Sequence, residues 1–153
     1  MSRVAVVLCL LTVGAFGCAE RVRPERPSPP ALDPAVLVDY RRAGGLAPRR
    51  DHLVVRRGRR AVLRGDSGRR RFRVGRGELS RLRAALERAD LARLERDQPE
   101  PDRLDIPPQD AINYQVIYDG HRVSFDQTQV PKPIEAALVR LDALVDARRG
   151  KGP

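Results

Sequence analysis

The sequence predicts an α+β domain in which a mostly antiparallel sheet carries two helices on one of its faces. Four short alternating runs separated by glycine-containing turns lie between residues 36 and 74. Two later segments repeat apolar residues at helical spacing, and a hairpin signal lies between them. Each helix has a single apolar stripe, so both are expected to cover the same face of the sheet.

The first four strands are predicted from period-two alternation. Val36, Val38 and Tyr40 alternate with their neighbours, and the glycines and proline of residues 42–48 are expected to break that strand. Three further strands are expected at residues 52–56, 61–64 and 71–74. The turns between them, residues 57–59 and 65–68, both contain glycine, which favours a meander of hairpins.

The period changes after residue 77. A helix is expected over residues 78–89, with Leu91 and Leu94 packing just beyond it, and residues 97–110 hold four prolines and form a loop. Asp119-Gly120 joins two alternating runs, a strong hairpin signal. Two prolines open a last helix that Gly150 ends. Its apolar face is Ile134, Leu138, Leu141 and Val145, and the predicted order is ββββαββα.

The first seventeen residues have the layout of an export signal. Arg3 precedes an apolar run over residues 4–13, which is too short to span a bilayer, and small residues then lead to Cys18. This layout predicts a signal peptide over residues 1–17 and lipidation of Cys18, with membrane anchoring in the cell envelope. Cleavage after Ala19 is the alternative, and it would give a secreted or periplasmic soluble protein.

Removal of the signal leaves no disulfide, because Cys9 lies inside it. Cysteine catalysis and cysteine-ligated metal are therefore excluded. Residues 18–34 are rich in proline and charge and are expected to be a tether. Residues 35–149 suit one domain, and residues 150–153 form a tail.

The chain has a net charge of +10, and only two of its thirty basic residues, Lys132 and Lys151, are lysine. A basic surface attracts anionic lipid, polysaccharide or nucleic acid. Nucleic-acid binding is not expected, because an exported protein rarely meets it and few aromatic residues are present to stack bases. We interpret most of the arginines as an incidental solvated surface.

Catalytic and metal-binding patterns are not evident in the sequence. His52 and His121 have no partner at metal-ligand spacing and are expected to be solvated or hydrogen-bonded. Serines 67, 80 and 124 lack the context of a nucleophile. The loop carboxylates Asp102, Asp105 and Asp110 lack EF-hand spacing and suit solubility or capping. No enzyme activity, cofactor or metal is expected, and a binding module is favoured.

The order of motifs resembles the emfourin family, small protein inhibitors of thermolysin-like zinc metallopeptidases. The resemblance covers about residues 36–146. It begins with a strand that runs into a double-glycine turn, residues 38–47, and continues with a leucine-rich helix end over residues 89–94. A tyrosine-rich hairpin and Val130-Pro131 before the last helix complete it. Pro48 departs from the family, which usually has another glycine there, and so does the lipoprotein leader.

The resemblance implies inhibition by a rigid segment that enters the cleft of an exported metallopeptidase. Such enzymes favour a bulky apolar residue just after the scissile bond, and Leu46 is the candidate anchor. Gly44, Gly45, Leu46 and Ala47 form the candidate inhibitory loop, in which the glycines supply backbone freedom. Leu46 could instead tuck under the sheet edge. The alternative function is a structural or interaction lipoprotein of the envelope without inhibitory activity.

Overall fold

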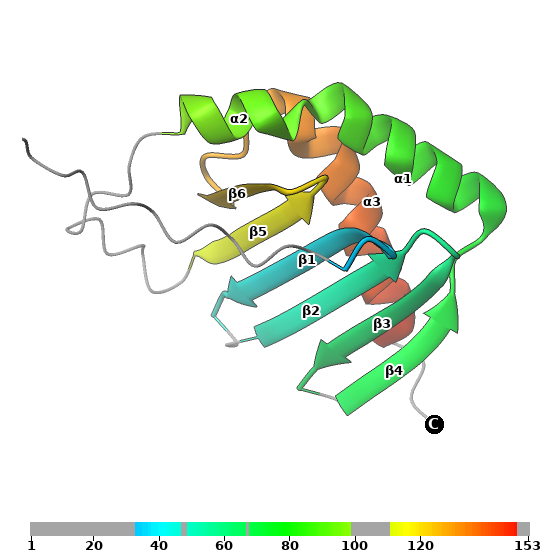
Figure 1. Ribbon diagram of the computed structural model, residues 1–153. Helices are drawn as coiled ribbons and strands as arrows, with labels where there is room; N and C mark the ends of the chain where they lie inside the picture. The colour runs from blue at the N-terminus through cyan, green and yellow to red at the C-terminus, as the bar shows by residue number, and fades with distance from the viewer. Residues whose placement is uncertain (1–32, 47–48, 67, 99–110, 150–153) are drawn as a thin grey trace, which may run out of the picture.

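The computed structural model describes residues 33–46, 49–66, 68–98 and 111–149. They form one antiparallel sheet and three helices (Figure 1). The elements are β1 (Val36–Gly44), β2 (Arg49–Arg56), β3 (Arg60–Gly65), β4 (Gly68–Arg73), α1 (Arg76–Ala89), α2 (Leu91–Asp97), β5 (Ile112–Tyr118), β6 (His121–Asp126) and α3 (Lys132–Arg149). The predicted α+β class with an antiparallel sheet is confirmed. The predicted signal peptide, Cys18, nearly all of the tether, the acidic loop residues and the tail lie outside the described residues.

The sheet has the strand order β4-β3-β2-β1-β5-β6. Strands β1 to β4 pair with their neighbours in sequence, which confirms the meander. Strands β5 and β6 form the predicted hairpin, with Tyr118 opposite His121. Asp119 and Gly120 at its tip both have positive φ, 51° and 84°, as a two-residue hairpin loop requires. Because β5 pairs with β1, the first strand lies in the middle of the sheet.

Strand β1 is longer than the sequence suggested. The prediction that residues 42–48 break the strand is wrong for residues 42–44, because β1 continues to Gly44. Gly44 is paired on both sides, opposite Arg49 of β2 and Ile112 of β5. Two neighbouring strands thus hold the backbone extended beyond the point where local signals would end it.

The predicted element order is wrong by one helix, because residues beyond Ala89 form the short helix α2. Asp90 adopts a left-handed backbone conformation with φ 46° and ends α1. Its carboxylate also accepts a hydrogen bond from the backbone N–H of Arg93 at 3.2 Å, which caps α2. One residue therefore ends the first helix and begins the second, and the observed order is ββββααββα.

Helix α2 lies beside β6, the strand at one edge of the sheet (Figure 1). The Glu95 carboxylate accepts a hydrogen bond from the backbone N–H of Arg122 at 3.2 Å. The Gln98 side chain bonds to both the backbone N–H and the carbonyl of Ser124. These contacts satisfy backbone groups that an edge strand would otherwise leave open to pairing with another chain.

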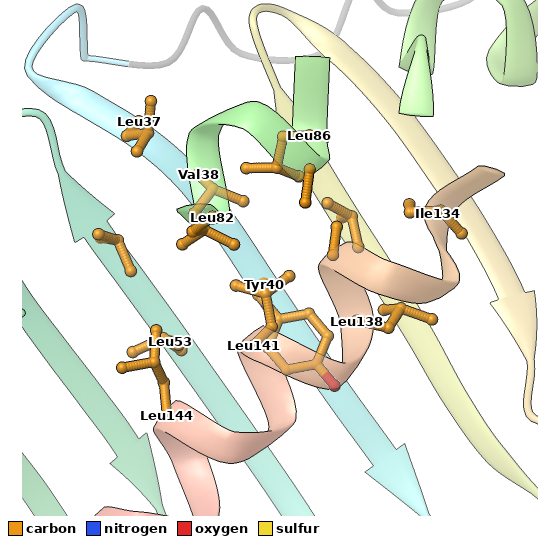
Figure 2. Packing of buried hydrophobic residues seen from close by; sticks show 14 of the residues in the cluster. Leu37, Val38, Tyr40, Leu53, Leu82, Leu86, Ile134, Leu138, Leu141 and Leu144 are labelled. Carbon is orange, nitrogen blue, oxygen red and sulfur yellow. The ribbon is translucent and has the colours of Figure 1, made fainter. Parts of the chain in front are cut away.

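Helices α1 and α3 pack against each other and against one face of the sheet, where the hydrophobic core lies (Figure 2). Fully buried side chains come from the sheet and from both of these helices: Val38, Tyr40 and Leu53 from the sheet, Leu82 and Leu86 from α1, and Ile134 and Leu141 from α3. The predicted apolar face of the last helix is confirmed, since its four residues are all buried. Within the described part of the chain, no helix combines the length and apolarity needed to cross a membrane.

Candidate functional site

The turn between β1 and β2 begins at two glycines with positive φ. Gly44 has φ 109° and Gly45 has φ 90°. A Cβ atom on Gly44 would lie 2.2 Å from the backbone oxygen of Ala111, so the chain approaches β5 more closely than any side chain would allow. The sequence predicted that these glycines give the turn its backbone conformation. The structure adds that Gly44 also fits the turn against the start of β5.

Leu46 projects from this turn into solvent. The exposed fraction of Leu46 is 90%. In the described part of the chain, the exposed large hydrophobic residues are Leu46 and Val139. The alternative in which Leu46 tucks under the sheet edge is therefore wrong. Ala47, the last residue of the candidate loop, and Pro48 after it lie outside the described residues.

Behind the turn, Arg42 joins β1, β2 and α3 through three carboxylates. Arg42 Nε donates to Asp51 Oδ2 at 2.8 Å and Nη1 to Asp142 Oδ1 at 2.8 Å. Nη2 donates to Asp146 Oδ1 at 2.5 Å. We call Arg42, Asp51, Asp142 and Asp146 the Arg42 cluster. The helix contributes two carboxylates four residues apart, so both lie on the side of α3 that faces the sheet.

The Arg42 cluster holds one arginine and three aspartates, and Arg149 offsets part of this excess of negative charge. Its Nε lies 3.2 Å from Asp51 Oδ1, although that oxygen makes no hydrogen bond, so the contact is an ion pair only. Burial lowers the pKa of Arg42, but hydrogen bonds to Asp146 and Asp51 outweigh it and raise the pKa overall. Arg42 therefore stays charged, and its side chain makes three hydrogen bonds to carboxylates.

A row of aromatic rings extends from the Arg42 cluster across the sheet. The Tyr40 hydroxyl donates to Asp142 Oδ1 at 2.6 Å. Burial and this contact raise the pKa of Tyr40 above its ordinary value, so the hydroxyl remains protonated. The Tyr40 ring stacks on Tyr114 with centroids 6.3 Å apart, and Tyr114 contacts Phe125 at 5.8 Å. Central and hairpin strands are thereby fixed to each other close to the turn.

Both histidines are hydrogen-bonded, as the sequence predicted. His52 Nε2 lies 2.9 Å from Asp39 Oδ2, and His121 Nδ1 lies 2.9 Å from Glu95 Oε2. His52 lies inside β2. Among the residues described, no group of three or more histidine, cysteine or acidic side chains could hold a metal ion. Ser80 lies on α1, Ser124 lies on β6 beside Gln98, and Ser67 is outside the described residues.

Sequence reasoning missed the Arg42 cluster. The sequence held only a weak signal for it. Asp142 and Asp146 directly follow Leu141 and Val145 of the apolar stripe of α3, and carboxylates at such positions are usually solvated. Their partner Arg42 is a hundred residues earlier.

Helix α3 also has a shallow hollow of about 410 Å³, lined by Glu135, Ala136, Val139 and Arg140. These four side chains do not form a set that could act together in catalysis.

A comparison of the sequence with models of known protein families found no match, and a comparison with curated proteins found no relative. The resemblance to emfourins therefore stays a prediction.

Proposed function

We propose that the protein is an exported lipoprotein whose domain binds and inhibits a thermolysin-like zinc metallopeptidase through the turn between β1 and β2. The observation that carries this proposal is the exposure of Leu46, 90% accessible on a double-glycine turn. An apolar side chain of this size in water costs free energy that a hydrophobic subsite would recover. The emfourin-like order of motifs supplies the class of partner.

The contacts that hold the strands on either side of the turn suit such a role. A binding loop loses less entropy on association when its conformation is already fixed. Strands β1 and β2 are paired up to Gly44 and Arg49, and Gly44 is held against Ala111. The Arg42 cluster then ties the same end of β1 to α3. Inhibition of this kind needs only a segment that occupies the cleft, and no reacting group of its own.

Inhibition can be measured by titrating the chain from residue 19 against a purified thermolysin-like peptidase with a fluorogenic peptide substrate. We expect tight inhibition that Leu46→Glu weakens by about 30-fold or more, as for a central apolar anchor. Val139→Glu is the matched control, because Val139 is also an exposed large hydrophobic residue, 65% accessible, but lies on α3. Its substitution should leave inhibition unchanged.

Absence of inhibition at micromolar protein, or equal weakening by the two substitutions, would overturn the peptidase mechanism and leave a non-inhibitory envelope lipoprotein. Anchoring is tested separately by metabolic labelling with a clickable fatty acid. Label should enter the native protein and be absent from Cys18→Ala, and equal labelling of both would refute acylation at Cys18.

A further inference from the structure

The face of the β3–β4 hairpin that points away from the helices is covered with arginine. Ala61 and Leu63 of β3 are buried in the core, so the alternate positions of β3 and their partners on β4 lie on the opposite face. All five arginines at these positions are exposed. They are Arg60 and Arg64 of β3 and Arg69, Arg71 and Arg73 of β4, and we call them the arginine face.

The register sets like charges directly against each other. Arg60 is opposite Arg73, and Arg64 is opposite Arg69. Directly opposed residues on antiparallel strands have Cβ atoms about 5 Å apart, and like charges in such pairs are destabilising. Within the described ranges, none of the five side chains forms an ion pair or hydrogen bond. The hairpin thus keeps a concentration of positive charge at a cost to its own stability.

Some basic residues elsewhere on the sheet do have acidic partners. Arg41 contacts Asp39 at 3.2 Å, and Arg56 contacts Asp33 at 3.1 Å. Asp39 also binds His52. The arginine face differs in gathering five exposed, unpaired arginines on one hairpin. This local concentration of positive charge indicates a surface that binds an external anion.

We propose that the arginine face binds the phosphate headgroups of an anionic phospholipid bilayer. The guanidinium group is weakly hydrated and can donate two parallel hydrogen bonds to a phosphate. The face lies on the outer strands of a sheet and not in a groove, which suits a broad, repeating partner. It holds no aromatic side chain, so it offers nothing on which nucleic-acid bases could stack.

The proposed anchor at Cys18 strengthens this inference and is not required by it. The chain between Cys18 and the first described residue, Asp33, spans at most about 50 Å when extended. An acylated protein would therefore hold its domain close to the bilayer, where even weak contacts between arginine and phosphate are effective. The test below uses unlipidated protein, so failure of the anchoring proposal would leave it intact.

Binding is measured by flotation of the chain from residue 19 with vesicles of phosphatidylglycerol and phosphatidylcholine, or of phosphatidylcholine alone. We expect binding to the anionic vesicles only, and its loss as salt is raised from 0.1 to 0.5 M, in line with electrostatic screening. The triple variant Arg60→Gln, Arg64→Gln, Arg71→Gln should partition on the order of 100-fold more weakly, at the usual contribution of each basic residue near a charged membrane.

A matched control removes the same charge elsewhere. Arg81→Gln, Arg83→Gln and Arg88→Gln alter exposed residues of α1 and should change partitioning only a few-fold. Because the first triple variant removes repelling charges, its thermal unfolding temperature should not fall, which separates lost binding from lost folding.

Equal weakening by the two triple variants would overturn the proposal, because the arginines would then act only through net charge. So would absence of binding to anionic vesicles, or a loss of binding to duplex DNA in the first variant with vesicle binding retained. Failure here is distinguishable from failure of the peptidase proposal. Leu46→Glu should not alter vesicle binding, and the arginine variants should still inhibit.

Discussion

At the scale of single residues, Gly44 is the position of the turn where a side chain would clash with the backbone of another segment. A methyl group there would meet the Ala111 backbone oxygen at 2.2 Å, on a backbone with φ 109°. Gly68 also has positive φ, 96°, but a methyl group there would meet nothing within 4 Å. Comparing substitutions at Gly44 and Gly68 therefore separates the cost of a steric clash from the cost of the backbone conformation.

We expect Gly44→Ala to lower the free energy of unfolding by about 2–4 kcal/mol, the sum of backbone strain and overpacking. Gly68→Ala should cost only about 1 kcal/mol, since strain alone remains. Urea denaturation followed by circular dichroism measures both values. Similar losses in the two variants would show that the close approach to Ala111 does not constrain the turn.

Asp39 is expected to make the stability of the folded domain depend on pH in the acid range. Burial raises the pKa of its carboxyl group, but the hydrogen bond and charge of His52, together with Arg41, outweigh burial and lower the pKa below 3.8. A carboxyl group with a lowered pKa in the folded state stabilises that state above its unfolded pKa, and the contribution disappears as pH falls through the folded value.

Asp39→Asn should therefore be less stable than the native protein at pH 7, by about 1–3 kcal/mol, because a buried charge-assisted hydrogen bond is lost. The difference should shrink as pH falls below about 4. Thermal unfolding at pH 7, 5 and 3 measures it. Asp119→Asn, an exposed turn residue that tolerates asparagine at φ 51°, serves as the control. A difference that is constant across the three pH values would contradict the assignment.

At the scale of elements, the Arg42 cluster determines how α3 lies against the end of the sheet. Asp51 is only 3% exposed, so its carboxylate depends on Arg42 and Arg149 for compensation. Arg41, the next residue towards the N-terminus of β1, makes one contact to Asp39, and 53% of its side chain is exposed. Two adjacent arginines on one strand thus differ in burial and in the number of carboxylates they contact.

Arg42→Met should lower the free energy of unfolding by about 3–5 kcal/mol, because it removes the hydrogen-bonding partner of the buried Asp51 carboxylate. Arg41→Met should cost about 1 kcal/mol or less, because the Arg41 side chain is half exposed and Asp39 keeps its contact with His52. Chemical denaturation of both variants provides the measurement. If the two losses are equal, the Arg42 cluster is not what fixes α3 to the sheet.

At the scale of the whole molecule, the sequence predicted features that depend on neighbouring residues. Alternation predicted the strands, Asp119-Gly120 predicted the hairpin, and apolar spacing predicted the buried face of α3. It did not predict that β5 pairs with β1, because that contact joins segments about seventy residues apart. The Arg42 cluster was missed for the same reason, since its carboxylates come from another strand and a distant helix.

Errors at element boundaries have specific tertiary causes. Strand β1 continues through residues that usually end a strand, because it is paired with a neighbouring strand on both sides. Helix α2 forms after Ala89 because Asp90 both turns the backbone and caps the new helix. For the candidate loop, the glycines were correctly expected to shape the turn, whereas the position of Leu46 was left open between two possibilities. Only the folded geometry could decide it.

The central position of β1 has a consequence for how the chain acquires its fold during synthesis. Strands β1 to β4 can pair as soon as residue 73 has emerged, whereas the other side of β1 must wait for residues 112–118. In that interval a half-built sheet presents an open hydrogen-bonding edge, which is the usual template for aggregation. Arg41 and Arg42 lie on that edge and would discourage a second nascent chain from pairing there. Charges that later serve the finished structure are thus expected to protect its unfinished form as well.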